Sequence, residues 1–126
     1  MNNYQHYYEE GDSEWRWLGA IDKAENIISL CSSYPHDSIL EVGAGEGSIL
    51  KRLSERGFGN KFYALEISPS GIERIKKKGI PRLMECALFD GYNIPYDDNK
   101  FDLSVLSHVF EHVEYPRKLL YDAVRV

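Results

Sequence analysis

Three glycines stand between two apolar segments at a spacing that suits ligand binding. Gly43, Gly45 and Gly47 follow a short apolar run and precede an amphipathic one, so the sequence predicts a strand, a tight turn and a helix in that order. A turn of this kind lets the backbone approach a ligand closely and aims helix N–H groups at it. The G-x-G-x-G spacing differs from the G-x-G-x-x-G of dinucleotide-binding turns and disfavours a dinucleotide ligand.

Two glutamates accompany this glycine turn. Glu41 lies two residues before the first glycine and would face the carboxyl edge of a sheet, where a ligand that carries an ammonium group could bind. Glu66 ends the next apolar segment, about 20 residues beyond the turn, where an acid can accept hydrogen bonds from both ribose hydroxyls. A surface carboxylate at a strand end is the plainer alternative for both residues. Glu66 predicts a nucleoside ligand, without indicating which one.

The elements that must position these residues alternate along the chain. Apolar runs predict four strands, at Ser38–Val42, Lys61–Ile67, Arg82–Leu88 and Phe101–Ser107. Periodicity and capping residues predict helices over Trp15–Cys31, from Gly47 towards Gly57, from Pro69 to Gly79, and from Pro116 onward with Leu119, Leu120 and Ala123 on its apolar side. Strands that alternate with helices favour an α/β fold with a mainly parallel, doubly wound sheet and right-handed crossovers.

The composition excludes several classes of function. Fifteen Lys and Arg against 20 Asp and Glu give a net charge of −5, and the basic run Lys76–Lys78 is short, so no nucleic-acid partner is expected. The sequence lacks the ~20 consecutive apolar residues of a membrane span. Met1–Glu10 lacks the pattern of a signal peptide, so we expect a cytoplasmic protein. Cys31 and Cys86 are far apart, which predicts buried free thiols and no metal site.

Four segments in order resemble the motifs of class I S-adenosylmethionine-dependent methyltransferases. Leu40–Gly47 (LEVGAGEG) is similar to motif I, and Ala64–Ile67 (ALEI) to the acidic motif II. Asp90–Tyr96 (DGYNIPY) is similar to the D-A-x-x-L-P-F loop, and Phe101–Val113 (FDLSVLSHVFEHV) to the fourth strand and the signature after it. The resemblance covers Ser38–Val126. It implies a Rossmann-like fold that lacks the last strands of the full family.

The resemblance also implies a cofactor and the residues that bind it. The cofactor would be S-adenosylmethionine, and its binding residues would be Glu41, Gly43, Ala44, Gly45, Gly47, Glu66, Ile67, Asp90, Gly91, Ser107 and His108. Asp90 would contact the adenine amine, with Gly91 replacing the usual alanine; a plain turn-forming aspartate is the alternative.

No catalytic residue follows from the sequence. His108 and His112 are candidates for proton chemistry, and Glu111 with His112 resembles an acid and histidine of relatives that act on quinone-like phenols. Lining the site and shaping a turn are the alternatives for these residues. The activated methyl group of the cofactor needs an in-line approach more than it needs chemical groups of the protein. We therefore expect direct methyl transfer to a small molecule.

Two other interpretations stay open. A non-catalytic module could bind the cofactor or a partner chain without turnover. A fragment of a nicotinamide-dependent oxidoreductase is disfavoured by the glycine spacing and by Glu41. Calorimetry, fluorescence titration and activity measurements distinguish the three interpretations.

We expect one domain over residues 1–126, with a helical segment at about 1–36 and the cofactor-binding core at about 37–126. Tyr4, Tyr7 and Tyr8 could serve as a lid on the site, and a mobile terminus is the alternative. Family members carry three further strands beyond the fourth. In this chain the apolar fourth strand would therefore have an exposed edge, which predicts a homodimer through that edge. Cover by the first or the last helix is the alternative.

Overall fold

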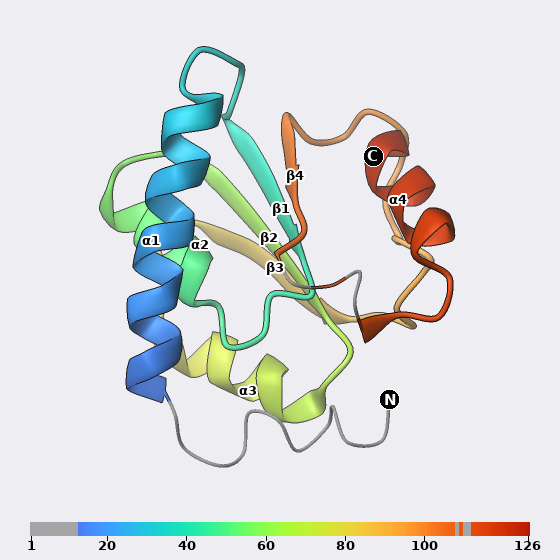
Figure 1. Ribbon diagram of the computed structural model, residues 1–126, viewed down its shortest axis with the longest axis horizontal. Coiled ribbons are helices and arrows are strands. Elements are labelled where there is room, and N and C mark those ends of the chain that lie inside the picture. The colour runs from blue at the N-terminus through green and yellow to red at the C-terminus, as the bar shows by residue number, and fades with distance from the viewer. Residues whose placement is uncertain (1–12, 108, 110–111) are drawn as a thin grey trace.

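The computed structural model describes residues 13–107, 109 and 112–126, and Figure 1 shows their arrangement. The elements along the chain are α1 (Ser13–Cys31), β1 (Ser38–Val42), α2 (Ser48–Glu55), β2 (Lys61–Glu66), α3 (Pro69–Lys78), β3 (Leu83–Leu88), β4 (Leu103–Val105) and α4 (Pro116–Arg125). Within these residues, four strands form one sheet in the order β3-β2-β1-β4, and every paired strand is parallel. The predicted α/β fold with a parallel sheet is confirmed.

The order of the strands determines where a ligand can bind. After β1 the chain moves to one side of the sheet to form β2 and β3, and β4 returns to the other side of β1. Glu41 of β1 pairs with Ala64 of β2 and with Val105 of β4. Ligands of open parallel sheets bind outside the carboxyl ends of the strands at such a reversal of order. The carboxyl ends of β1, β2 and β4 are therefore the expected position of the site.

The two faces of the sheet carry separate cores. Figure 1 shows α1, α2 and α3 on one face and α4 on the other. Ile39 and Leu40 of β1 point to opposite faces, as the alternation of side chains along a strand requires. Ile39 belongs to the core under α1–α3, with Leu50, Leu53, Phe62 and Ile75, and Leu40 to the core under α4, with Leu65, Ile94, Leu119 and Ala123. Burial on both faces explains why apolar residues stand at consecutive positions in β1 (Ile39 and Leu40) and β2 (Ala64 and Leu65).

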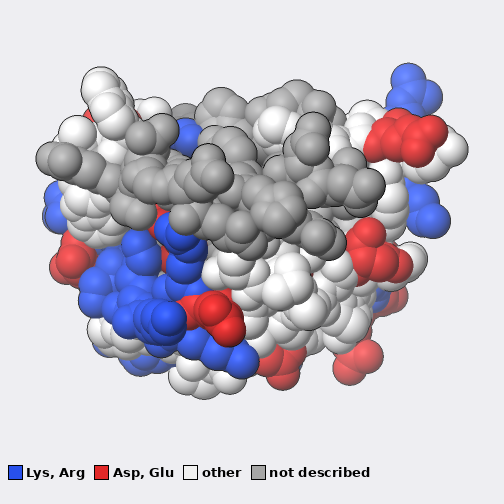
Figure 2. Space-filling model, turned by 90° about the horizontal axis from the view of Figure 1, so that it is seen from below, with Lys and Arg blue, Asp and Glu red and all other residues white. Residues whose placement is uncertain are grey.

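Helix α3 begins and ends as its sequence predicts. Ser68 is the N-cap, and its hydroxyl accepts a hydrogen bond from the N–H of Gly71; Pro69 opens the helix. Gly79 caps the end with a φ of 65°, in the left-handed region that favours glycine. Lys76–Lys78 lie in the last turn, beside the negative end of the helix dipole. Figure 2 shows Lys and Arg gathered on one side of the face that includes α3.

The fourth strand is shorter than the sequence predicts. A strand is expected over Phe101–Ser107, whereas β4 covers Leu103–Val105. Phe101 donates its N–H to the carbonyl of Val126 at the end of the chain (2.8 Å), so it lies outside the ladder with β1. Leu106 follows β4 and packs against the core under α4. The residues on either side of β4 thus contact Val126 and the core under α4 instead of continuing the ladder with β1.

Three side chains are more exposed than expected. Leu120, predicted on the apolar side of α4, is 45% exposed, because Leu119 and Ala123 form the buried face. Cys31 and Cys86 are free, as predicted, but each is half-buried.

Among the described residues, the helices include none that is long and apolar enough to span a bilayer. The same residues include no group of three or more His, Cys, Asp and Glu suited to a metal ion.

Candidate cofactor site

The glycine turn follows β1 directly and is bonded to the neighbouring strand. Gly43, Gly45 and Gly47 have φ angles of 71°, 63° and 83°, all in the left-handed region. Residues with a Cβ rarely adopt this conformation, which explains the three glycines. Gly43 and Ala44 both donate their N–H groups to the carbonyl of Leu65 in β2 (2.8 and 3.0 Å). The turn therefore lies across the carboxyl ends of β1 and β2.

Glu66 connects the glycine turn to the start of α3. Its side chain is fully buried; Oε1 accepts the N–H of Gly45 (3.0 Å) and Oε2 the N–H of Ser68 (2.8 Å). Burial raises the pKa of this carboxyl, and the backbone donors oppose the shift. A Cβ at Gly71 would lie 2.8 Å from the Gly45 carbonyl oxygen and 2.9 Å from Cγ of Glu66. The close approach of α3 to the turn thus requires a glycine.

Glu41 is also buried, but its bonding differs from that of Glu66. Its side chain is 2% exposed, and Oε1 has no hydrogen-bond partner within the described part of the chain. Burial raises the pKa of this carboxyl well above its usual range, the negative charge of Glu66 adds to the shift, and Lys23 on α1 opposes it. The surface alternative is wrong for both glutamates. A buried carboxylate oxygen without a donor is unfavourable, so a hydrogen-bond donor or a further cation at Oε1 would stabilise the charged form of Glu41.

Side chains of α3 support the glycine turn from one side. The guanidinium of Arg74 lies 3.5 Å from Oε2 of Glu46, a residue of the turn that is 6% exposed. The ammonium of Lys78 donates to the hydroxyl of Ser48, the first residue of α2 (3.0 Å). These contacts join residues 28 and 30 positions apart, so the spacing of motifs could not predict them. They hold α3 against the start of α2.

Four predicted cofactor residues converge on one small cavity. Gly43, Glu66, Ile67 and Gly91 line it together with His112. The remaining wall consists of Phe89, Val109 and Val113. The cavity volume is about 20 Å³, roughly the space of one water molecule. The structure thus brings these four predicted residues together, whereas Glu41, Ala44, Gly45, Gly47, Asp90 and Ser107 are not part of this lining.

Asp90 lies beside this cavity but is bonded within its own loop. Oδ1 accepts the N–H groups of Tyr92 and Asn93 (2.8 and 2.7 Å), and the side-chain amide of Asn93 donates to Oδ2. These hydrogen bonds lower the pKa of the Asp90 carboxyl. The bonding is that of a turn-forming aspartate. A contact with adenine stays a prediction, as a carboxylate has about four lone-pair sites.

Of the remaining predicted residues, some lie near the glycine turn or β4, and others lie outside the part of the chain that the structure describes. Ala44 and Gly47 lie in the glycine turn, and Ser107 is half-buried just beyond β4. His108 and Glu111 lie outside the described residues, as do Tyr4, Tyr7 and Tyr8.

Sequence reasoning missed Tyr92 and Val109 near the cavity. The hydroxyl of Tyr92 accepts the N–H groups of Glu114 and Tyr115 (3.0 and 3.2 Å). Val109 is 7% exposed and packs on Gly43. Tyr92 is one of nine tyrosines, and no local signal distinguishes it.

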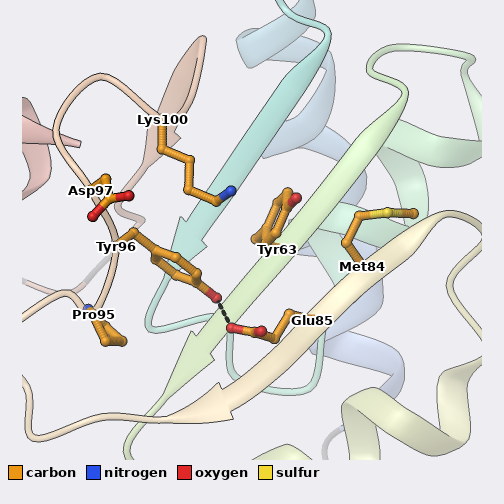
Figure 3. A pocket seen from close by; sticks show the side chains of 7 residues that line it. All are labelled: Tyr63, Met84, Glu85, Pro95, Tyr96, Asp97 and Lys100. Atoms are coloured by element: carbon orange, nitrogen blue, oxygen red, sulfur yellow. Dashed lines mark hydrogen bonds between the residues drawn. The ribbon is translucent and has the colours of Figure 1, made fainter.

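A larger cavity lies elsewhere, on the sheet face opposite α1–α3 (Figure 3). Its volume is about 370 Å³, and it is lined by Tyr63, Met84, Glu85, Pro95, Tyr96, Asp97 and Lys100. The Tyr96 hydroxyl donates to Glu85, and burial followed by this bond raises the pKa of Tyr96. The Lys100 ammonium lies 5.2 Å from the centre of the Tyr63 ring. None of the predicted cofactor residues lines this cavity. We therefore take the smaller cavity, which four of them line, as the candidate cofactor site.

Comparison with known proteins identifies the family. Residues 40–126 match the methyltransferase domain family, so the chain belongs to that family. It is 33% identical over 107 residues to the sarcosine/dimethylglycine N-methyltransferase of Halorhodospira halochloris, with 81% of this chain and 38% of that protein covered. It is 29% identical over 126 residues to the uncharacterized protein MJ1123 of Methanocaldococcus jannaschii, with 100% of this chain and 56% of that protein covered. The chain spans about half, or less, of the length of these relatives.

Solved structures agree on the fold. The glycopeptide N-methyltransferase MtfA, complexed with sinefungin, superposes with a TM-score of 0.67 at 22% identity, covering 84% of this chain and 44% of that chain. The chain has the Rossmann-like fold of class I S-adenosylmethionine-dependent methyltransferases. This family favours the methyltransferase interpretation over the nicotinamide-dependent one.

Proposed function

We propose that the chain binds S-adenosylmethionine at the carboxyl ends of β1 and β2 and serves methyl transfer to a small molecule. The observation that carries this proposal is the convergence of Gly43, Glu66, Ile67 and Gly91 on one cavity beside the glycine turn. These residues come from three separate sequence motifs of the family that the chain belongs to.

The residues of the chain suit binding and orientation. Bound S-adenosylmethionine supplies a methyl group that its sulfonium already activates. The left-handed glycines let the backbone of the turn approach a ligand. Glu66 keeps lone pairs for ribose hydroxyls after it accepts the N–H groups of Gly45 and Ser68. The Oε1 atom of Glu41 can accept from an ammonium group.

The acceptor is proposed from the relatives. The sarcosine/dimethylglycine enzyme and the glycopeptide enzyme are both N-methyltransferases by name, so an amine nitrogen is the first acceptor to test. A nitrogen lone pair would form the new bond to the methyl carbon while the carbon–sulfur bond breaks, with its electrons remaining on sulfur. A primary or secondary amine such as sarcosine would then release its nitrogen proton to solvent, whereas a tertiary amine such as dimethylglycine would become a quaternary ammonium with no proton to release.

A second function is a cofactor-binding module without turnover. The residues that converge on the cavity are ones that the family resemblance assigns to the cofactor, and none of its lining residues is assigned to an acceptor. In this case the site would bind the cofactor and leave the acceptor unbound.

One assay separates these functions. The chain is incubated with labelled S-adenosylmethionine and with amines that include sarcosine and dimethylglycine, and mass spectrometry follows S-adenosylhomocysteine and the methylated amine together. Equal formation of both products supports methyl transfer. Binding of the cofactor without product supports the module. Failure to bind the cofactor contradicts both.

A further inference from the structure

Three aromatic rings on the sheet face opposite α1–α3 form a cage that holds an ammonium group. Tyr63 lies on β2, and Tyr96 and Phe101 belong to the chain between β3 and β4. The rings meet edge to face, with interplanar angles of 78°, 67° and 90° and centres 4.9 to 5.8 Å apart. The ammonium of Lys100 lies over all three rings, at 5.2, 5.8 and 5.8 Å from their centres. The negative ring faces attract this cation.

Two carboxylates give the cage a negative surrounding. Glu85 stands opposite Tyr63 in the ladder between β2 and β3, so both side chains lie on the same face of the sheet. The Tyr96 hydroxyl donates to Glu85 and holds the carboxylate beside the ring. Glu85, Asp97 and Lys100 line the cavity of about 370 Å³ together with both tyrosines (Figure 3). Two negative charges and one positive charge therefore border the cavity, which favours a cation over an anion.

The dimensions of the cage suit a methylated ammonium ion. The Lys100 nitrogen, at 5.2 to 5.8 Å from the ring centres, is near the outer limit of about 6 Å for cation–π contacts. A methyl group on a nitrogen at this position has a bond length of about 1.5 Å and would reach ring carbons at contact distances of about 3.5–4.0 Å. The lysine ammonium, in contrast, is compact and strongly hydrated, and its flexible stem lets it return to water.

We propose that the cavity bordered by β2, β3 and the loop before β4 is a second ligand site, which binds a small methylated ammonium ion in the place that the Lys100 ammonium occupies without ligand. This site shares no lining residue with the cofactor cavity. Tyr63 precedes Glu66 by three positions on β2, which separates them by about 10 Å along the strand and places their side chains on opposite faces. The proposal is therefore independent of cofactor binding.

The experiment titrates the chain with choline, which carries a trimethylammonium group, and with the neutral alcohol in which a carbon atom replaces the choline nitrogen. NMR follows the ε-methylene protons of Lys100, which the rings of the cage shield, and the N-methyl protons of choline. We expect saturable binding of choline. The Lys100 signals should then move towards those of a lysine in water, while the N-methyl protons become shielded. The neutral alcohol should produce neither change.

Two variants and a matched control test the cage itself. Lys100→Ala empties the cage and should tighten choline binding roughly 2- to 30-fold, the range for one cation–π contact. Lys118→Ala removes the same charge from a lysine that lies over the single ring of Tyr92 (5.5 Å), outside the cavity, and should leave the affinity unchanged. Glu85→Gln should weaken binding about 1.5- to 5-fold, the range for an exposed ion pair. All three side chains are exposed, so the fold should remain intact.

Four results overturn the proposal. They are a choline titration without saturation, equal responses to choline and the neutral alcohol, equal affinities of Lys100→Ala and Lys118→Ala, and saturable binding of inorganic phosphate that moves the Lys100 signals. The last result would assign an anion to Lys100 instead. S-adenosylhomocysteine takes no part in these titrations, so their failure leaves the proposed function standing.

Discussion

Two regions of the chain, one from β1 to α3 and one from the end of β3 to α4, are held together in different ways. From β1 to α3, the backbone of one turn is bonded to the next strand, and Glu66 accepts N–H groups from both turns. From the end of β3 to α4, backbone bonds such as that of Phe101 to Val126 are joined by side-chain contacts: the Tyr92 hydroxyl accepts the N–H groups of Glu114 and Tyr115, and Arg125 pairs with Asp122 and Asp98 (2.8 and 2.9 Å). Gly43, Gly45 and Glu66 of the first region are the binding frame that we propose for the cofactor, whereas the second region depends on hydrogen bonds and ion pairs of individual side chains.

The largest expected effect is a loss of the binding frame. Gly45→Val places a β-branched residue at a φ of 63°, in the turn whose N–H binds Glu66. A branched side chain disfavours this φ and would occupy the approach of the ligand. We expect cofactor binding to disappear in calorimetry while the circular dichroism spectrum stays native.

Gly57→Val is the matched control for this change. Gly57 has a φ of 69°, and a Cβ there would have no atom within 4 Å. The control therefore introduces similar backbone strain far from the cavity. If both variants lose binding equally, strain rather than the binding frame explains the result, and the assignment of Gly45 is wrong.

The next effect concerns Glu66. Glu66→Gln replaces one accepting oxygen by an NH₂ group, which faces a backbone donor of Gly45 or Ser68. We expect cofactor binding to weaken by roughly 1.5–3 kcal/mol and the free energy of unfolding to fall by about 1–3 kcal/mol. Titration calorimetry and urea denaturation measure the two changes. Glu73→Gln, on an exposed residue of α3, should change neither. Binding as tight as in the unchanged protein would refute the ribose assignment.

Glu41 is expected to lower the free energy of unfolding at neutral pH, so its replacement should not destabilise the protein as that of Glu66 does. Its pKa is raised by burial, so the folded state binds the proton more tightly than the unfolded state. The free energy of unfolding contributed by this group is therefore complete below about pH 4.3, the usual pKa of glutamate, and is lost as pH rises through the folded pKa. Glu41→Gln should remove this decline.

Urea denaturation of both proteins between pH 4 and pH 8 measures the effect of Glu41. The difference between the two curves reports Glu41 together with its coupling to Glu66, and it cancels the contributions of groups such as Asp90 and Asp122, whose pKa values are lowered. Parallel curves across this range would show that Glu41 titrates as an exposed glutamate does.

The smallest expected effect is association through β4. Among the described residues, β4 pairs with β1 alone and has three residues, and α4 contacts it through the Ser104 hydroxyl, which donates to the Ala123 carbonyl (3.3 Å). An unpaired strand edge can pair with a second copy. We predict concentration-dependent dimerisation in size-exclusion chromatography with light scattering. A monomer at high micromolar concentration would favour a covered edge instead.

The same comparison explains what could be predicted from the sequence. The glycine turn, the cap at Ser68 and the end of α3 at Gly79 depend on neighbours within a few residues, so local patterns identified them. The bond from Gly45 to Glu66 spans 21 residues, and the contact of Val109 with Gly43 joins distant segments. The local pattern of apolar and polar residues does not predict contacts between such distant positions. The overlong prediction for β4 has the same origin, because Phe101 binds the backbone of Val126.

Titration of the full chain with S-adenosylhomocysteine in a calorimeter tests the central claim most directly. The ligand is the demethylated product, so binding is measured without turnover. The binding frame of Gly43, Gly45 and Glu66 predicts a saturable heat with one ligand per chain, and loss of that heat in Gly45→Val but not in Gly57→Val. A folded protein that gives no heat and no shift in thermal unfolding with the ligand would contradict the account.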